Sequence, residues 1–270
     1  MHYATAGEGE VVLLLHGFPE SWYSWRHQIA ALAQQYRVIA PDLRGYNETE
    51  KQGPYDTDTL QADVLALLDH ADASAAHIAG HDWGGAVAWL LAIQHPEHVR
   101  SLVVCNIPHP ALFQRSLRRN PRQMLRSWYI LFFQLPWLPE RVFAARRYHL
   151  LARMLINDCR PGTFTREDVT EMLAGWRRNG LGGGFNWYRA LLRHPRRLPK
   201  PVPKVIAPTL MIWGEDDSAL GKELTLGTEE YVEDFELTFL PNTSHWVQQE
   251  EPRKVTELIL AHLAKATIGG

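Results

Sequence analysis

The chain has 270 residues, of which 46% are hydrophobic, so it can bury a substantial core as one large domain or as one domain with an insertion. Its formal net charge is -2, whereas nucleic-acid binders normally carry a strong positive charge. The charge therefore argues against nucleic acid as a partner. The two cysteines, Cys105 and Cys159, form no CxxC spacing, so neither a disulfide framework nor a zinc site is expected.

The N-terminal segment and the longest apolar stretch bear on location. The segment from Met1 to Glu10 shows no basic stretch followed by an apolar run of signal-peptide length. The longest apolar run, Trp128–Leu138, has about a dozen residues and is interrupted by Pro136, which is well short of the roughly 20 that span a bilayer. Together with the sparse cysteines, these features predict a soluble, cytoplasmic protein without a membrane partner.

Short β-rich runs alternate with longer helical patterns along most of the chain, which predicts an α/β fold with a mostly parallel sheet flanked by helices. A strand is expected near the start, at His2–Ala6, and a final amphipathic helix around Val255–Ala264. Between them the predicted strands are Val11–Leu15, Arg37–Ala40, His77–Gly80, Ser101–Asn106, Thr209–Gly214 and Glu236–Leu240.

A long insertion separates the last two of these strands from the others. Residues 110–203 lack strand-like runs and are bounded by prolines, so they are expected to form a helical cap between core segments 1–109 and 204–270. The glycines at 180–184 are expected to form a turn between cap helices. The insertion opens with an arginine run that is either a solvated helix face, the favoured interpretation, or a contact with an anionic surface: Arg115, Arg118, Arg119, Arg122 and Arg126.

The motif GHDWGG, Gly80–Gly85, follows a predicted strand and precedes a helical pattern. A side chain on a tight strand-to-helix turn needs small residues two positions away on either side, and Gly80 and Gly84 flank Asp82 in that way. The position that serine often occupies in such turns holds aspartate. Because a carboxylate can attack saturated carbon, Asp82 is expected to form an ester with the substrate.

Hydrolysis of that ester requires a general base and donors for an oxyanion. His245 follows the strand that ends at Leu240, and Asp217, preferred over Glu215 and Asp216, follows the strand that ends at Gly214. Since the carboxyl ends of parallel strands share one edge of the sheet, these residues are expected to meet Asp82 there.

The oxyanion donors are expected to come from two loops at the same edge. The motif HGFPE, His16–Glu20, follows the first parallel strand, and taken alone it is also compatible with a simple turn at the end of that strand. Combined with the elbow at Asp82, it predicts that the backbone N–H groups of Phe18 and Trp83 form the oxyanion hole.

These motifs together resemble the α/β-hydrolase-fold epoxide hydrolases of the soluble type, over nearly the whole chain. The resemblance implies that two cap tyrosines, Tyr129 and Tyr188, hold the epoxide oxygen, that the Phe18–Pro19 peptide is cis, and that no metal or organic cofactor is used. Members usually carry an additional strand before the one at His2–Ala6. The segments that carry the resemblance are His16–Gln28, Pro41–Tyr46, Gly80–Gly85, Gly214–Asp217 and Ser244–Trp246.

The implied reaction converts a small organic epoxide and water to a vicinal diol. An opening epoxide leaves as a strongly basic alkoxide, so it needs a neutral O–H donor, and tyrosine stays protonated at pH 7. The residues expected to line the apolar substrate pocket, beside Phe18 and Trp83, are Trp22, Trp128, Phe132 and Trp246.

Two other functions are compatible with the motifs. A haloalkane or haloacid dehalogenase uses the same aspartyl ester, but halide needs no proton donor and no asparagine follows His16-Gly17. A non-catalytic ligand-binding protein with this fold is the other alternative, against which the apparently complete triad argues. The expected partners are a small organic epoxide and water, with a homodimer as a possible assembly.

Overall fold

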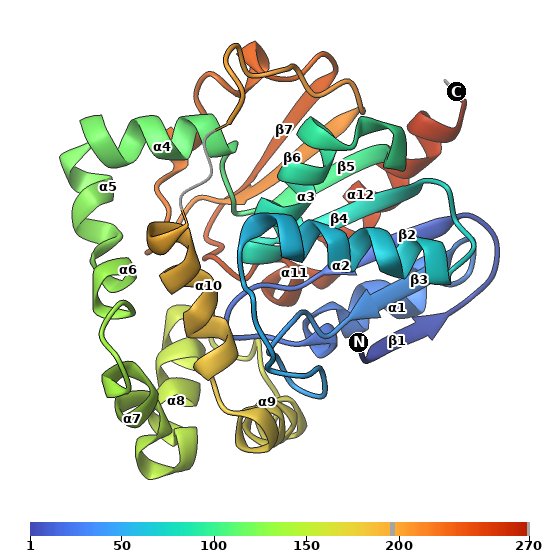
Figure 1. The fold of residues 1–270 in the computed structure, drawn as a ribbon. Coiled ribbons are helices and arrows are strands. Elements are labelled where there is room, and N and C mark those ends of the chain that lie inside the picture. The colour runs from blue at the N-terminus through green and yellow to red at the C-terminus, as the bar shows by residue number, and fades with distance from the viewer. Residues whose placement is uncertain (195–197, 269–270) are drawn as a thin grey trace.

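The computed structural model of the protein describes residues 1–194 and 198–268, and its core is a sheet covered by helices on both faces (Figure 1). Every strand expected from the sequence is present, with ends that differ by at most two residues. The strands are β1 (Tyr3–Ala6), β2 (Val11–Leu15), β3 (Arg37–Pro41), β4 (Ala76–His81), β5 (Val99–Cys105), β6 (Thr209–Gly214) and β7 (Phe235–Leu240).

The order of the strands explains where a site can form. Within the described residues the sheet runs β1-β3-β2-β4-β5-β6-β7, with β1 antiparallel to β3 at one edge and the other neighbours parallel. The mostly parallel sheet is therefore confirmed. In this order β3 lies on one side of β2 and β4 lies on the other. The connection that leaves β2 and the connection that leaves β4 therefore run in opposite directions across the sheet, which creates a crevice at the carboxyl ends of these two strands.

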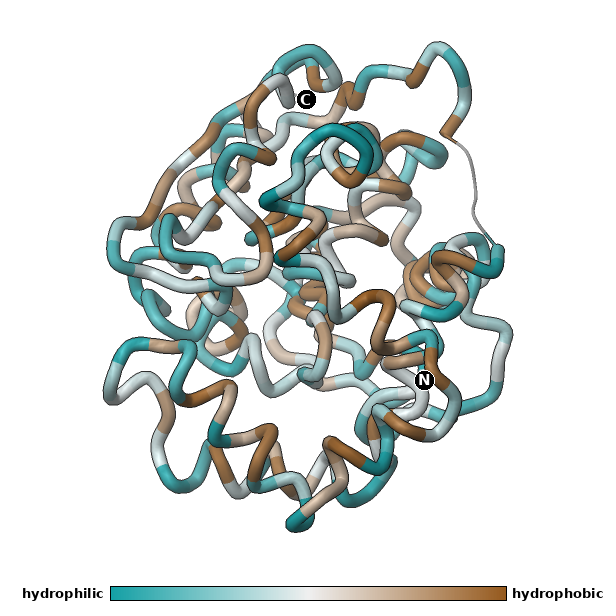
Figure 2. Tube along the Cα trace, turned by 90° about the vertical axis from the view of Figure 1, so that its left-hand side faces the viewer, coloured by the Kyte–Doolittle hydropathy of each residue, from teal (hydrophilic) through white to brown (hydrophobic). Residues whose placement is uncertain are grey.

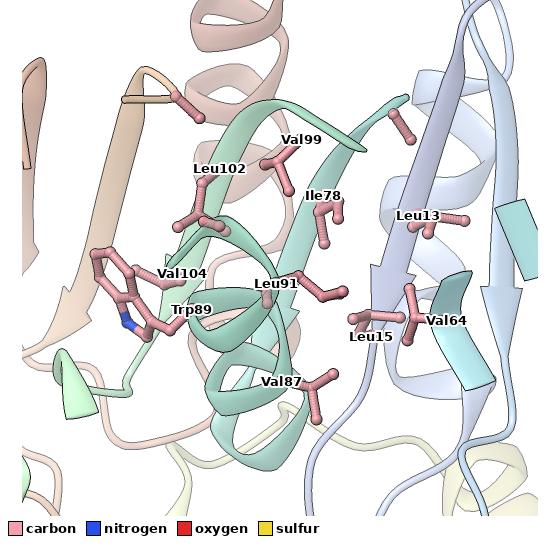
Figure 3. Close-up of a cluster of buried hydrophobic side chains, with 14 of the residues drawn as sticks. Leu13, Leu15, Val64, Ile78, Val87, Trp89, Leu91, Val99, Leu102 and Val104 are labelled. Carbon is pink, nitrogen blue, oxygen red and sulfur yellow. The ribbon is translucent and has the colours of Figure 1, made fainter. Parts of the chain in front are cut away.

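Alternating side chains of the central strands build two cores. Leu13 and Leu15 of β2 pack in a cluster with residues of α2 and α3, whereas Val12 and Leu14 pack in a second cluster with residues of α1 and α12. Figure 3 shows the first cluster, in which Leu15, Ile78 and Val104 face α3. The helices that flank the sheet are α1 (Arg26–Leu32), α2 (Thr57–His70), α3 (Asp82–Gln94), α11 (Val247–Glu250) and α12 (Pro252–Ile268).

The insertion after β5 is helical, as predicted, and its helices gather on one side of the sheet (Figure 1). They share an apolar core that also includes Trp246 and touches Phe18 and Trp83, which joins the cap to loops at the carboxyl edge. The cap helices are α4 (Pro110–Arg119), α5 (Pro121–Arg126), α6 (Trp128–Phe132), α7 (Leu138–Ala144), α8 (His149–Asp158), α9 (Arg166–Asn179) and α10 (Gly182–Arg193).

The glycine cluster was expected to be a turn throughout, and this is only partly correct. Gly180 and Leu181 form the turn, whereas the glycines from Gly182 onward begin α10. A Cβ on Gly183 would collide with the backbone of Gly45, so the absent side chain lets α10 approach the loop after β3. In the part of the chain that is described, no helix combines the length and apolarity needed to cross a bilayer.

Candidate active site

Asp82 stands at the bend between β4 and α3. Its φ of 48° lies in the left-handed region, as expected at a strained strand-to-helix turn. A Cβ on Gly80 would come within 2.6 Å of the Gly84 carbonyl oxygen, and one on Gly17 would come within 2.6 Å of the Asp82 Cβ. The glycines are therefore required by close backbone approach, and they let the elbow lie directly against the loop after β2.

That loop supplies a donor to the carboxylate. The Phe18 backbone N–H donates to Asp82 Oδ1 at 2.9 Å, and the Phe18–Pro19 peptide is cis, as the resemblance implied. Trp83 lies in the first turn of α3, where backbone N–H groups have no acceptor within the helix. The two amides expected to form an oxyanion hole thus belong to the two segments that meet at Asp82.

His245 and Asp217 form a buried pair beside Asp82. His245 Nδ1 lies 2.7 Å from Asp217 Oδ2, and its Nε2 lies 3.7 Å from Asp82 Oδ2. The other oxygen of Asp217 accepts the backbone N–H groups of Ala219 and Leu220, each at 2.8 Å. The structure therefore brings together the three residues predicted from strand ends, with the imidazole between the two carboxylates.

The charges of Asp82, Asp217 and His245 determine the pKa values of His245 and Asp217. Burial alone would lower the pKa of His245, but the charge and hydrogen bond of Asp217, aided by Asp82, raise it to about 9. Burial would raise the pKa of Asp217, yet the charge and hydrogen bond of His245, with the Leu220 amide, bring it below its ordinary value. The resting pair is therefore an imidazolium held between carboxylates.

Tyr129 and Tyr188 come from α6 and α10, and their rings meet nearly perpendicularly with centroids 5.9 Å apart. Tyr188 also lies 5.4 Å from the Phe18 ring and 5.1 Å from the Trp83 ring. Burial raises the pKa of both tyrosines above the usual value, and the negative charge of Asp82 raises it further. Both phenols are thus neutral O–H donors at physiological pH.

The comparisons with known proteins agree with this arrangement. Residues 10–252 match the family model described as the alpha/beta hydrolase fold. Human "Epoxide hydrolase 4" is 41% identical over 98% of this chain and 76% of its own length. The chain belongs to the α/β-hydrolase fold family, among the epoxide hydrolases.

Two further relatives cover almost the full length of both chains. The "AB hydrolase superfamily protein YfhM" of Bacillus subtilis (strain 168) is 42% identical over 97% of this chain and 94% of its own. A crystal structure of a Bacillus megaterium epoxide hydrolase in complex with an inhibitor superimposes with a TM-score of 0.90 at 31% identity, covering 97% of this chain and 96% of that one. The likeness therefore includes both the core and the cap of this α/β hydrolase.

The residues predicted to line the substrate pocket lie in different surroundings. Trp246 is buried with its ring 5.0 Å from that of His245, and Phe132 packs within the cap core. Trp128, in contrast, is 63% exposed, and Trp22 packs in the cluster on the α1 and α12 face of the sheet, so the prediction is wrong for both.

Phe133 takes a place that the sequence interpretation missed. Its ring lies 5.5 Å from that of Phe18, 5.6 Å from Tyr129 and 4.9 Å from Tyr188. Phe133 follows Tyr129 by four residues, and residues at that spacing share one face of a helix. The spacing places Phe133 on the same face as Tyr129, but because every residue from 128 to 133 is apolar or aromatic, the hydrophobic pattern alone does not select Phe133 over Trp128.

Asn106, which was also missed in the sequence analysis, is hydrogen-bonded to Asp217. Its side-chain amide donates to Asp217 Oδ2 at 2.7 Å and its Oδ1 accepts the Gly214 N–H at 3.0 Å. The residue directly follows β5, and its position after a parallel strand could have indicated a role at the same edge. Asn106 thus connects β5 to the segment that carries the acid of the pair.

A second buried acid–histidine pair lies behind the site. His81 precedes Asp82, and its ring nitrogens lie 2.8 Å from Glu20 Oε2 and 3.0 Å from the His245 carbonyl oxygen. Both partners are oxygen acceptors, so each ring nitrogen of His81 faces an oxygen. Burial would raise the pKa of Glu20, but the charge of His81 lowers it below the ordinary value. Both residues belong to motifs recognised in the sequence, although their contact with each other was not predicted.

Proposed function

We propose that this α/β hydrolase opens small organic epoxides to vicinal diols through a covalent ester on Asp82. The observation that carries the proposal is a carboxylate at the elbow, with one oxygen held by the Phe18 amide and the other beside His245. Two neutral phenols from the cap, Tyr129 and Tyr188, complete the arrangement. A nucleophile, a base and proton donors are thereby supplied by separate groups.

The first step uses the asymmetry of the carboxylate. Asp82 Oδ1 accepts the Phe18 N–H, which leaves Oδ2 as the oxygen that attacks an epoxide carbon. The new C–O bond forms while the ring C–O bond breaks, and the ring oxygen takes a proton from Tyr129 or Tyr188. Water protonates the tyrosinate, and the hydroxide that results takes a proton from the His245 imidazolium, so this step ends with a neutral hydroxyalkyl ester, a neutral tyrosine and a neutral imidazole.

The second step regenerates the carboxylate. His245 takes a proton from water, whose oxygen attacks the ester carbonyl carbon, and the negative charge develops on Oδ1 opposite the Phe18 and Trp83 amides. The Cγ–Oδ2 bond then breaks and His245 gives its proton to the departing diol oxygen. The carboxylic acid left on Asp82 transfers its proton to His245, which restores the carboxylate and the imidazolium. Because esterification removes the charge of Asp82, which helps to raise the pKa of His245, the imidazole becomes a better base once the ester has formed.

The test is one turnover of styrene oxide in water enriched in heavy oxygen, followed by mass analysis of the peptide that contains Asp82. We expect label in that carboxylate and none in the first diol, because the diol leaves with Oδ2. Label in the diol alone would show direct attack of water and contradict the ester route. Parallel assays of a haloalkane for halide release separate this activity from that of a dehalogenase.

The finer statements about partners and location are also proposals. An epoxide and water are the proposed substrates. The two cysteines are free and buried, which supports a reducing compartment such as the cytoplasm. A homodimer stays a prediction, and light scattering of the purified protein measures it directly.

A further inference from the structure

The outer face of the cap carries an apolar stripe that none of the described residues covers. Leu125, Leu131 and Trp128 are 76%, 68% and 63% exposed. Met124, Trp128, Leu131 and Leu135 follow one another at intervals of three or four residues along α5, α6 and the turn after α6, so they lie on one side of this path. Contiguous exposed apolar surface of this kind marks interaction sites.

This stripe is not required by the cap's own packing. The opposite side of α6 presents Ile130 and the neighbouring Phe133 to the apolar cap core, where Phe133 contacts Phe185 and Tyr188 of α10. In Figure 1, α5 and α6 form the margin of the molecule, with α10 between them and the sheet. The inner side of this helical path therefore has its partners, and the outer side has solvent.

The segment of the chain that carries the stripe is rich in positive charge. Between residues 110 and 157 the chain has nine arginines and one carboxylate, Glu140, although the whole chain has a net charge of -2. Glu140 is paired with Arg189 of α10 at 2.6 Å, so it does not balance the outer arginines. The arginines, all exposed, are Arg115, Arg118, Arg119, Arg122, Arg126, Arg141, Arg146, Arg147 and Arg153.

Trp137 adds an aromatic group to this face. Its side chain is 60% exposed, and the Arg141 guanidinium lies 4.8 Å from the centre of its ring. Figure 2 views the molecule from this side and shows hydrophobic and hydrophilic segments alternating along the chain. Exposed tryptophan and leucine with arginine around them is the composition of helices that lie in the surface of an anionic bilayer.

We propose that the outer cap face, formed by α5 to α7 and the arginines around it, docks peripherally on an anionic lipid bilayer. The apolar stripe enters the boundary between headgroups and acyl chains while the arginines contact lipid phosphates. A second copy of the chain fits this face less well, because a symmetric contact would place like charges opposite each other. The proposal replaces the solvated-face interpretation of the arginine run and the prediction that the protein has no membrane partner.

Docking in this orientation connects the bilayer with the proposed active site. Tyr129 lies on α6 between the exposed Trp128 and the buried Ile130, on the same short helix as Leu131. A helix with its side chains is about 10 Å across, so the docked surface and the phenol are separated by roughly one helix. Apolar substrates concentrate in bilayers, which places them on this side of the enzyme.

The experiment measures flotation of the purified full chain with vesicles of phosphatidylcholine, with or without phosphatidylglycerol. We expect binding to the anionic vesicles that weakens with added salt, and much weaker binding to the neutral ones. The Leu125→Ser/Leu131→Ser and Arg122→Gln/Arg126→Gln variants should each bind about tenfold more weakly or worse. The matched control is Arg253→Gln/Lys254→Gln, which removes two exposed charges from α12 and should bind like the parent.

A second measurement needs no variant. Brominated lipids in the anionic vesicles should quench the fluorescence of the unmodified protein, because Trp128 and Trp137 enter the bilayer surface. Absence of binding, equal binding to neutral vesicles, or unchanged binding of the arginine variant would overturn the proposal. A dimer that the leucine substitutions dissociate, without vesicle binding, would assign the face to a second copy. Turnover of a water-soluble epoxide without vesicles, unchanged in the variants, shows that folding and the proposed activity are intact.

Discussion

The two halves of the site are held in place by different forces. In the core half, Asp82, Asp217 and His245 follow strand ends and are fixed by hydrogen bonds, including backbone donors to both carboxylates. In the cap half, Tyr129 and Tyr188 lie on helices and are positioned by packing among aromatic rings. The core half is therefore organised around charge and the cap half around neutral donors, so changes in the two halves should affect different steps of the reaction.

The largest effect is expected from Asp82→Ala, in the core half. Removing the nucleophile should lower diol formation by about four orders of magnitude or more, because no ester can form. Diol release from styrene oxide measures the loss. Asp216→Asn, which changes an exposed carboxylate beside Asp217, is the matched control and should keep near-normal activity. Substantial turnover by Asp82→Ala would mean that water attacks the epoxide directly.

Tyr129→Phe and Tyr188→Phe test the cap half and should each slow ester formation about a hundredfold to a thousandfold. Ester hydrolysis should change little, since the phenols serve the opening of the ring. Stopped-flow or quenched-flow measurements of a single turnover separate the two steps. Tyr148→Phe, a partly buried cap tyrosine, is the control. Equal slowing of both steps would contradict the division between the halves.

The pair of His245 and Asp217 should make folding stability depend on pH. The pKa of His245 is about 9 in the folded protein, against about 6.5 for a free histidine, so the proton is bound more tightly in the folded state. The resulting stabilisation is fully present below pH 6.5 and is lost as the pH rises through 9, by up to about 3 kcal/mol. Urea unfolding at pH 6 and pH 9.5 measures it, and Asp217→Asn should reduce the difference.

The smallest effect is expected from Asn106→Gly, which removes the amide that holds Asp217. Glycine is chosen because the φ of Asn106 is 45°, which alanine tolerates poorly. We expect ester hydrolysis to slow about tenfold while ester formation is unchanged, because a positioning residue of the base does not touch the nucleophile. Single-turnover kinetics with a pH profile of the second step provide the measurement. A change confined to stability would show that Asn106 is only structural.

The site residues of the core half could be predicted from the sequence alone, whereas several of those in the cap could not. Asp82, Asp217 and His245 were found because parallel strands bring their carboxyl ends to one edge, and the structure brings these three residues together there. Tyr129 and Tyr188 came only from a family resemblance, because nothing in the helical pattern singles out a tyrosine. Trp128 was wrongly placed in the pocket, since every residue from 128 to 133 is apolar or aromatic and the pattern distinguishes no inner side.

By itself, the sequence determined the alternation of strands and helices, the elbow at Asp82 and the strand ends that carry its partners, because these depend on local periodicity and on glycine at close turns. Only the tertiary structure decided which side of α6 is buried, that Phe133 meets the phenols, and that Glu20 pairs with His81. Those outcomes depend on contacts between segments far apart in the chain, where burial selects one partner among many that are chemically equivalent in sequence.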